Sequence, residues 1–251
     1  MRFLLSPAKK MNRDTDSLPW QDLPRFLPQA EQLWQAMGQM DAAALKALWK
    51  CNDRIAEQNV QRLRTGSLRT GLTPAILAYE GIAFQYMAPS VFTAEQFDYV
   101  QAHLRILSGL YGVLRPFDGV TPYRLEMQAR LSVGGAKDLY AFWGGRLAAA
   151  LWAETDCIVN LASQEYSRCV SRFPVAGKRF ITCVFGEEKD GKVVEKGTLC
   201  KMARGEMVCF AAEKAVTRPE QLQEFHRHYR FVPERSTETE YVFLRTGEWL
   251  A

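Results

Sequence analysis

The amino-acid sequence predicts a single α/β domain, of the α+β kind, with a mixed β-sheet surrounded by helices. Short apolar segments typical of strands are interleaved with amphipathic segments typical of helices. Asp190-Gly191 is a strong hairpin signal, which argues against an all-parallel sheet. No repeat, charge block or low-complexity linker divides the chain, and 251 residues can form one domain. We therefore expect one domain over residues 1–251.

The composition is that of an ordinary globular protein, with 47% hydrophobic and 24% charged residues. No apolar stretch approaches the roughly 20 residues that a transmembrane helix needs. The first residues do not resemble a signal peptide, because the apolar run Phe3-Leu4-Leu5 is followed closely by Pro7. We expect a cytoplasmic protein that does not bind membranes.

Cysteine and histidine usage gives no metal or redox signature. The six cysteines include no Cys-x-x-Cys pair, and most have apolar neighbours, so reduced, buried thiols are expected. His226 and His228 are two of only three histidines, and their spacing suits one face of a strand. The sequence therefore predicts no metal and no cofactor.

The first half of the chain predicts a strand and several helices. Residues 2–5 read as a short buried strand that Ser6-Pro7 closes. Apolar residues recur at helical spacing from about residue 30, and Asp41 and Asp53 are placed to cap the two helices that follow. The segment 76–79 is compatible with either a strand or a helix.

The clearest predicted helix begins at Thr93, which forms a Thr-x-x-Gln capping box with Gln96. Gly109 is a suitable stop for this helix. Its apolar positions follow at i, i+3, i+7 and i+10: Phe97, Val100, Leu104 and Leu107.

The second half alternates between the two kinds of element. The sequence predicts a helix over 138–152, a central strand over 157–162, a strand over 179–185 that leads into the Asp190-Gly191 hairpin, a helix over 198–215, a short helix near 219 and a last strand over 241–245.

The common catalytic motifs are absent. The sequence has no Gly-x-Gly-x-x-Gly after a predicted strand, no Gly-x4-Gly-Lys-Ser/Thr and no Gly-x-Ser-x-Gly. No catalytic residue is assigned. The net charge of +4 and the isoelectric point of about 8.7 permit a polyanionic partner without requiring one.

Polar clusters follow two of the predicted strands. Lys9 and Lys10 come just after the first strand, where sheet proteins often bind ligands, although an ordinary solvated loop has the same composition. Asn160, Ser163 and Glu165 come at the end of the predicted central strand and are candidates for a pocket.

Two further clusters are rich in cations. Gly109 and Gly112 lie near Arg105, Arg115 and Arg124, an arrangement that can hold a phosphate but equally fits a helix cap whose arginines pair with nearby acids. In the segment 201–207, Lys201 and Arg204 share a helix face, which is also typical of a solvated basic surface.

Together the four clusters resemble the bacterial YaaA family of peroxide-stress proteins. The segments that carry the resemblance occur in the family's order and span most of the chain; they are 6–9, 103–116, 122–127, 137–140, 142–144, 160–163, 165–166, Lys201 and 203–205.

The resemblance implies a DNA-binding protein with a helix-hairpin-helix element and a positively charged cleft in an unusual α/β fold. It also implies a link to peroxide survival and to limiting free intracellular iron. The Thr93 helix and the turn over 108–112 are the expected place of the hairpin. DNA, as duplex or distorted, would be bound largely without regard to sequence. The residues expected to contact it are Lys9, Lys10, Arg105, Ser108, Gly109, Gly112, Arg115, Arg124, Lys201 and Arg204.

The alternative is an enzyme that acts on a phosphorylated small molecule or nucleotide. It predicts a deep pocket with a carboxylate of perturbed pKa, whereas DNA binding predicts an open groove. Direct iron sequestration has little support, because the histidines and cysteines form no recognisable ligand set. The polar pocket would contain Lys9, Arg124, Tyr123, Glu126, Asn160, Ser163 and Glu165.

Overall fold

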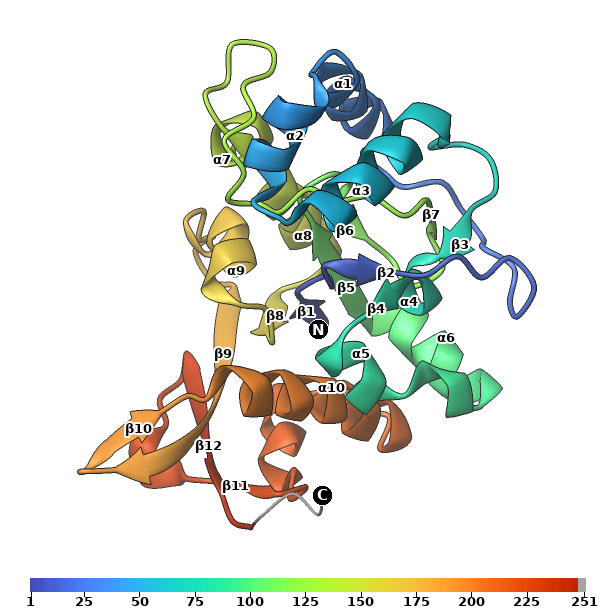
Figure 1. Ribbon diagram of the computed structural model, residues 1–251. Coiled ribbons are helices and arrows are strands. Elements are labelled where there is room, and N and C mark those ends of the chain that lie inside the picture. Colours follow the sequence, from blue (N-terminus) through green and yellow to red (C-terminus); the bar gives the residue numbers. More distant parts are fainter. Residues whose placement is uncertain (248–251) are drawn as a thin grey trace.

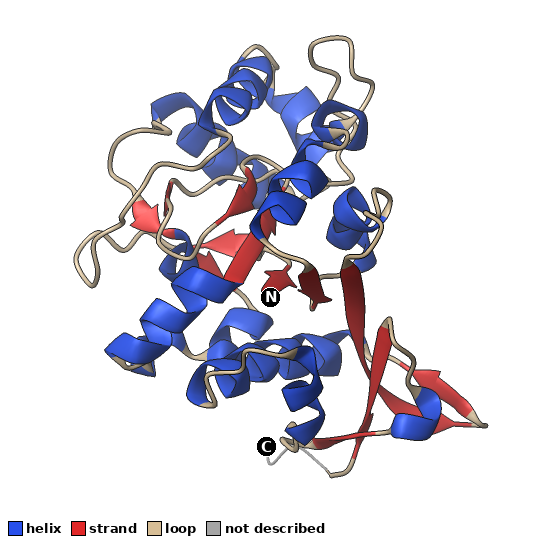
Figure 2. Cartoon of the chain, turned by 180° about the vertical axis from the view of Figure 1, so that it is seen from behind, coloured by secondary structure: helices blue, strands red, loops and turns tan. Residues whose placement is uncertain are grey.

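The computed structural model describes residues 1–247 and arranges them around an eight-stranded mixed β-sheet (Figures 1 and 2). The strand order is β11-β12-β9-β8-β1-β5-β6, and β10 pairs with β9. The strands are β1 (Arg2–Leu5), β5 (Leu104–Ser108), β6 (Gly112–Leu114), β8 (Cys157–Asn160), β9 (Arg179–Lys189), β10 (Lys192–Val194), β11 (Tyr229–Phe231) and β12 (Glu240–Arg245). The predicted mixed sheet is confirmed.

The centre of the sheet is parallel and its margins are antiparallel. β1 pairs in parallel with β5 and with β8, and β9 pairs in parallel with β8 and β12. β6, β10 and β11 each join their neighbour antiparallel. Phe3, Leu4 and Leu5 in β1 have at most 1% of their surface exposed, because helices cover both faces of the central strands.

Helices pack on both sides of these strands. α6 contacts β1 and β5, and α10 contacts α6 and β9; α8 and α9 contact each other. Figure 1 shows α8 and α9 above the central strands and α6 and α10 below them. The α-helices are α1 (Leu27–Gly38), α2 (Ala42–Trp49), α3 (Asp53–Thr65), α4 (Ala75–Ala78), α5 (Ile82–Met87), α6 (Ala94–His103), α7 (Leu139–Trp143), α8 (Arg146–Glu154), α9 (Gln164–Ser171) and α10 (Gly197–Glu213).

Smaller elements complete the fold. Two short antiparallel pairs, β2 with β4 and β3 with β7, join the loops that follow β1 and β6 to the segment around α4. Their bounds are β2 (Lys10–Met11), β3 (Thr73–Pro74), β4 (Tyr79–Glu80) and β7 (Gly119–Val120), and the 3-10 helices are η1 (Pro89–Val91), η2 (Pro219–Glu224) and η3 (Pro233–Arg235).

The capping box of the Thr93 helix is confirmed, but the predicted length is wrong. Thr93 Oγ1 accepts the Gln96 N–H and the Gln96 side chain accepts the Thr93 N–H, yet the helix ends at His103. The next five residues are the buried strand β5. The Ser108–Gly112 turn therefore closes a β-hairpin between β5 and β6, and the helix-hairpin-helix motif predicted at this place is not formed by these residues.

Two other boundaries differ from the prediction, and the structure settles one segment that the sequence left open. The helix expected over 138–152 is two helices, because Gly144 at the end of α7 has a φ of 49° that a continuing helix does not allow. Asn52, not Asp53, caps α3, whereas Asp41 caps α2 as expected. The ambiguous segment 76–79 ends the short helix α4 and begins β4.

The hairpin between β9 and β10 is confirmed. Asp190 and Gly191 both have positive φ values, 51° and 71°, as the two-residue turn of a tightly twisted hairpin requires.

The six cysteines are free thiols. Burial raises the pKa of Cys169 and of Cys183 to about 12 and that of Cys200 to about 11. Burial also raises the pKa of Cys157 and of Cys209. Within residues 1–247, no helix has the length and apolar character needed to cross a membrane.

Candidate functional site

The carboxyl ends of β1 and β8 meet at a topological switch point of the sheet. From β1 the chain passes to β5 on one side, and from β8 it passes to β9 on the other, although β1 and β8 are neighbours. Open α/β sheets bind ligands in the crevice that this reversal leaves. Here Ser6 Oγ accepts the Ser163 N–H at 2.8 Å and lies 3.2 Å from Ser163 Oγ, which holds the two strand ends together.

A cavity of about 390 Å³ lies at these strand ends and is called the central cavity below. Five separate segments line it: the loop after β1, the start of α5, the segment before residue 127, the start of α9 and one face of α10. The lining residues are Leu5, Ser6, Pro7, Ala8, Lys9, Lys10, Glu80, Gly81, Ile82, Ala83, Phe84, Tyr123, Arg124, Leu125, Glu126, Leu161, Ser163, Glu165, Tyr166, Lys201 and Arg204.

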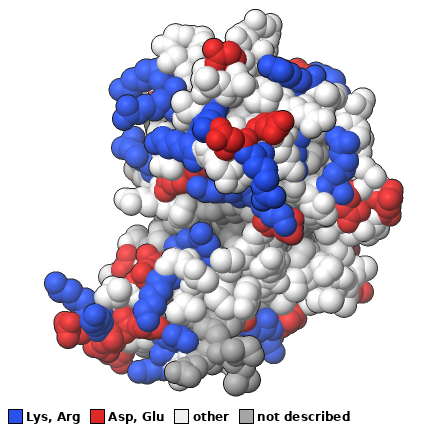
Figure 3. Space-filling model, in the orientation of Figure 1, with Lys and Arg blue, Asp and Glu red and all other residues white. Residues whose placement is uncertain are grey.

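Cations from three distant parts of the sequence surround the central cavity. Figure 3 shows Lys and Arg gathered beside a hollow that crosses the middle of this face. We call the five cationic lining residues the basic rim: Lys9, Lys10, Arg124, Lys201 and Arg204. All five are predicted DNA contacts, so the sequence clusters that supplied them converge in the fold.

The basic rim is only partly neutralised. Lys9 Nζ lies 3.0 Å from Glu126 Oε2 and Lys10 Nζ lies 2.7 Å from Glu80 Oε1, and both lysine side chains are mostly exposed. Arg204 makes a long contact of 3.4 Å with Glu195. The Lys10–Glu80 pair is exposed on both sides and therefore contributes little free energy, so a phosphate can replace Glu80 as the partner of Lys10 at small cost.

Besides Glu80, two carboxyl groups line the central cavity among these cations. Glu126 bridges Lys9 and Arg124, with 3.0 Å to each. Glu165 accepts the Gln128 N–H at 3.3 Å and forms no ion pair within the described chain. Burial raises the pKa of Glu165 above its usual value, the nearby Glu126 raises it further, and the Gln128 N–H and Lys9 oppose the shift.

The walls of the central cavity are apolar and fixed by hydrogen bonds behind them. Tyr123 Oη lies 2.6 Å from Ser108 Oγ and 2.9 Å from Tyr79 Oη. These contacts hold the Tyr123 ring beside the cavity. Phe84 and Tyr166, also nearly buried, supply further aromatic surface.

The close approach of α5 and α10 brings the remaining walls together. A Cβ atom on Gly205 would lie 2.0 Å from the Ala83 carbonyl oxygen, so the two helices touch backbone to backbone. Lys201 and Arg204 precede Gly205 on α10 and therefore reach the start of α5.

Three predicted phosphate contacts lie behind the central cavity instead of in it. Ser108 is fully buried, and its hydroxyl also accepts the Tyr111 N–H at 2.8 Å. A Cβ on Gly109 would lie 2.4 Å from the Leu125 carbonyl oxygen, and one on Gly112 would lie 2.7 Å from the Leu147 side chain. These residues let neighbouring segments pack closely and expose no backbone to a ligand.

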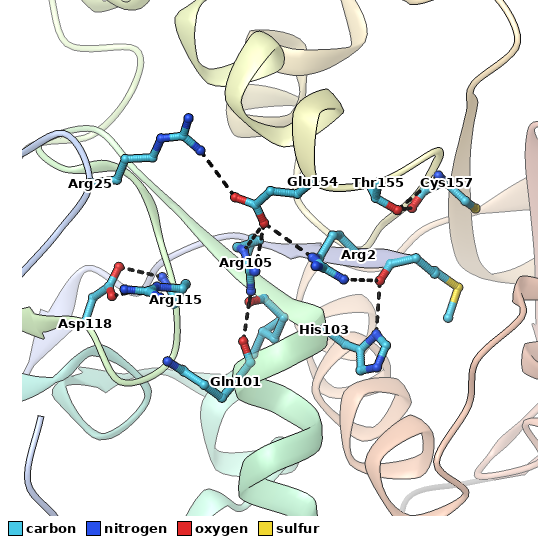
Figure 4. A network of polar contacts seen from close by, with 12 residues as sticks. Arg2, Arg25, Gln101, His103, Arg105, Arg115, Asp118, Glu154, Thr155 and Cys157 are labelled. Carbon is cyan, nitrogen blue, oxygen red and sulfur yellow. Dashed lines mark hydrogen bonds and ion pairs between the residues drawn. The ribbon is translucent and has the colours of Figure 1, made fainter. Parts of the chain in front are cut away.

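Arg105 and Arg115 lie near the amino ends of the parallel strands, opposite the central cavity (Figure 4). Arg105 has 5% of its surface exposed and lies 2.8 Å from Glu154 Oε2. Arg115 pairs with Asp118 at 3.1 Å and with Asp22 at 2.9 Å. Both arginines are therefore engaged within the protein, away from the central cavity.

The predicted pocket is formed by six of its seven residues. Asn160 is the exception: its side chain accepts the Ala162 N–H at 3.0 Å and donates to Thr182 at 3.3 Å, and it lies outside the lining. Sequence reasoning missed the contribution of Gly81, Ile82 and Phe84, which no motif marks. The one sequence signal for this segment is Gly81, which stands before the short apolar run of residues 82–84.

The comparisons with known proteins show the family of the chain. The family model described as peroxide stress protein YaaA matches residues 1–235. The chain belongs to the YaaA family. A UPF0246 protein of Agathobacter rectalis is 51% identical over 246 residues, which cover 98% of this chain and 99% of that protein. A UPF0246 protein of Lachnoclostridium phytofermentans is 48% identical over 246 residues, which cover 98% of this chain and 96% of that protein.

Several of the YaaA-like segments meet at one place in the fold. The segments 6–9, 122–127, 165–166 and 203–205 all contribute to the central cavity, and Ser108 and Gly109 support it from behind. Within residues 1–247, no group of three His, Cys, Asp or Glu side chains is placed to hold a metal ion.

Proposed function

We propose that this YaaA-family protein binds DNA through the basic rim and does so largely without regard to sequence, as part of a peroxide-stress role. The observation that carries the proposal is the convergence of Lys9, Lys10, Arg124, Lys201 and Arg204 around one hollow. Lysine and arginine on phosphates supply most of the sequence-independent affinity of proteins for DNA.

The proposal also offers a physical link to iron. Cations condense around DNA, and a protein that neutralises phosphates releases the counterions that were there. Bound protein would therefore displace loosely held iron from the DNA backbone, where peroxide would otherwise generate radicals. In this account the influence on iron follows from DNA binding.

Fluorescence anisotropy with labelled duplex, bulged and four-way-junction DNA tests the proposal between about 50 and 200 mM salt. The wild-type protein should bind, with an affinity that falls steeply as salt rises. Lys10→Ala with Lys201→Ala should weaken binding to all three DNA structures. It should also reduce the slope of log K against log salt by about 1.8, since each phosphate contact contributes about 0.9.

The matched control removes two positive charges from the β9–β10 hairpin, Lys189→Ala with Lys192→Ala. Both of these residues are exposed and lie outside the central cavity. If this control loses as much affinity as the rim variant, net charge explains binding and the rim does not. No wild-type binding at about 50 mM salt overturns the proposal.

The second candidate function is an enzyme acting on a phosphorylated small molecule in the central cavity. The specific observation in its favour is Glu165, a carboxyl group with a raised pKa in a partly enclosed, mostly apolar space. This alternative expects no DNA affinity in the same assay, so the two functions are separated by one measurement.

A further inference from the structure

We propose that the central cavity receives the base of an unpaired nucleotide in the bound DNA, with the Glu165 carboxylate accepting a hydrogen bond from the amino group of that base. The inference rests on the proposed DNA binding. It adds that the protein recognises one extrahelical nucleotide, which is held in a pocket that the basic rim surrounds.

The size and position of the cavity support a single nucleotide. A volume of about 390 Å³ falls in the range of roughly 300–1,000 Å³ that small-molecule pockets occupy. A duplex cannot enter such a space, whereas one nucleotide can. Because the cations lie around the same space, a phosphate backbone that follows the rim passes over its opening.

The walls suit a flat aromatic ring. Phe84, Tyr123 and Tyr166 line the cavity together with aliphatic side chains, and each has at most 7% of its surface exposed. Enzymes and binding proteins hold extruded or single-stranded bases by stacking them against aromatic and apolar side chains. The hydrogen bonds of Tyr123 to Ser108 and Tyr79 fix one wall in advance, which lowers the ordering cost of binding.

The acidic residues of the cavity decide which hydrogen-bonding groups of the base are recognised. Glu126 already bridges Lys9 and Arg124, whereas Glu165 forms no ion pair within residues 1–247. An ionised carboxylate only accepts hydrogen bonds, and in base recognition it pairs with amino groups. The cavity should therefore favour guanine, adenine or cytosine over thymine, which has no amino group.

An unpaired nucleotide enters this pocket at the lowest cost in free energy. Extruding a base from a duplex costs a few kcal/mol, and the cost is least where the base is mismatched, damaged or already unpaired. DNA with a single-nucleotide bulge should therefore bind better than a fully paired duplex of the same length and charge.

The decisive comparison uses two bulged duplexes that differ only in the base: one with a guanine bulge and one with an abasic bulge. Their backbones are alike, so the ratio of their dissociation constants measures the contribution of the base to the affinity. We expect the guanine bulge to bind about tenfold more tightly, as stacking of one base on aromatic side chains implies. Ile82→Trp, which narrows the cavity, should bring the ratio to about one.

The carboxylate is tested by replacing guanine with hypoxanthine, which lacks the exocyclic amino group. Wild-type protein should prefer the guanine bulge, and Glu165→Gln should reduce that preference, because a neutral amide oxygen accepts a weaker hydrogen bond than a carboxylate, while thermal unfolding shows that the variant is folded. The control Glu234→Gln changes an exposed residue of η3 outside the cavity and should keep the preference.

The outcomes separate this inference from the function on which it rests. Equal affinity for the guanine and abasic bulges, with salt-dependent binding of both, overturns the base pocket and leaves DNA binding in place. No affinity for either DNA overturns both. A guanine-over-abasic ratio that Ile82→Trp leaves unchanged places the base outside the central cavity and also overturns the inference.

Discussion

Ser108 shows how a single residue can serve the site without touching a ligand. Its hydroxyl holds Tyr123 at 2.6 Å and accepts the Tyr111 N–H at 2.8 Å. Replacing such a buried partner leaves other polar groups without hydrogen bonds. The residue belongs to the sequence segment that carries the family resemblance, and its place in the fold assigns it a supporting role.

Glu206 on α10 leads to a pH-dependent prediction. One carboxylate oxygen is buried without a hydrogen-bond partner within the described chain, and burial raises the pKa to about 7, against the opposing effect of Arg227. The native state therefore favours the protonated form more than the unfolded state does. Stability from this group is full below the ordinary pKa of about 4.5 and is lost as pH rises through about 7.

Glu206→Gln removes the ionised form and should stabilise the protein at pH 8 by about 1–2 kcal/mol, a value reduced because the group is only half buried. At pH 4.5 the variant should gain nothing. Denaturant unfolding at both pH values checks this. The interpretation fails if the gain is the same at the two pH values.

The contact between α5 and α10 sets a strict size limit at Gly205. Gly205→Ala places a methyl group 2.0 Å from the Ala83 carbonyl oxygen, so one helix must move away from the other. Overpacking of this kind costs about 1–3 kcal/mol. It also displaces Lys201 and Arg204, so the variant should lower both the midpoint of urea unfolding and the affinity for DNA.

Gly197→Ala is the matched control on the same helix. No atom lies within 4 Å of the Cβ position at Gly197, so alanine should change the free energy of unfolding by less than about 0.5 kcal/mol. Equal losses for the two variants would show that the helix itself, not its contact with α5, is sensitive.

At the scale of elements, the sequence predicts most strands and helices but not where α6 ends. Leu104 and Leu107 continue the helical spacing of Phe97 and Val100, and yet they lie in β5. A strand buried on both faces needs no alternation, so its apolar residues can match a helical pattern by chance. Arg105 did not mark the strand, because its charge is neutralised by Glu154, far away in the sequence.

At the scale of the whole molecule, the two ends of the sheet are arranged for different purposes. Near the amino ends, Glu154 gathers Arg2, Arg25 and Arg105 into an internal network (Figure 4). At the carboxyl ends, cations face an open hollow. Positive charge is thus neutralised within the protein at the amino ends, whereas at the carboxyl ends Lys9, Lys10 and Lys201 stay exposed.

Glu154→Ala should separate stability from binding. The Arg105 side chain is 6% exposed and would lose its counterion, which should cost about 2–4 kcal/mol in the free energy of unfolding. DNA affinity of the folded variant should match the wild type, since the network is remote from the basic rim. Glu31→Ala, which breaks the exposed pair with Arg69, should leave stability nearly unchanged. Weakened DNA binding by folded Glu154→Ala would contradict this division.

The candidate site could be predicted in part because it lies at strand ends. Polar residues after β1 and β8 are legible in the sequence, and the switch point brings them together. The contribution of α5 could not be predicted, since it depends on packing against α10 more than a hundred residues later in the chain. Whether a cation faces the hollow or a buried acid also depends on tertiary partners, as Lys201 and Arg105 show.

The buried thiols have a consequence for a protein that works when peroxide is abundant. Peroxide oxidises the thiolate far faster than the thiol. Burial raises the pKa of Cys169 and of Cys183 to about 12, so both stay protonated at pH 7. Cys157, Cys200 and Cys209 also have raised pKa values. Five of the six cysteines are thus held as thiols, the form that the oxidant whose effects the family counters attacks least readily.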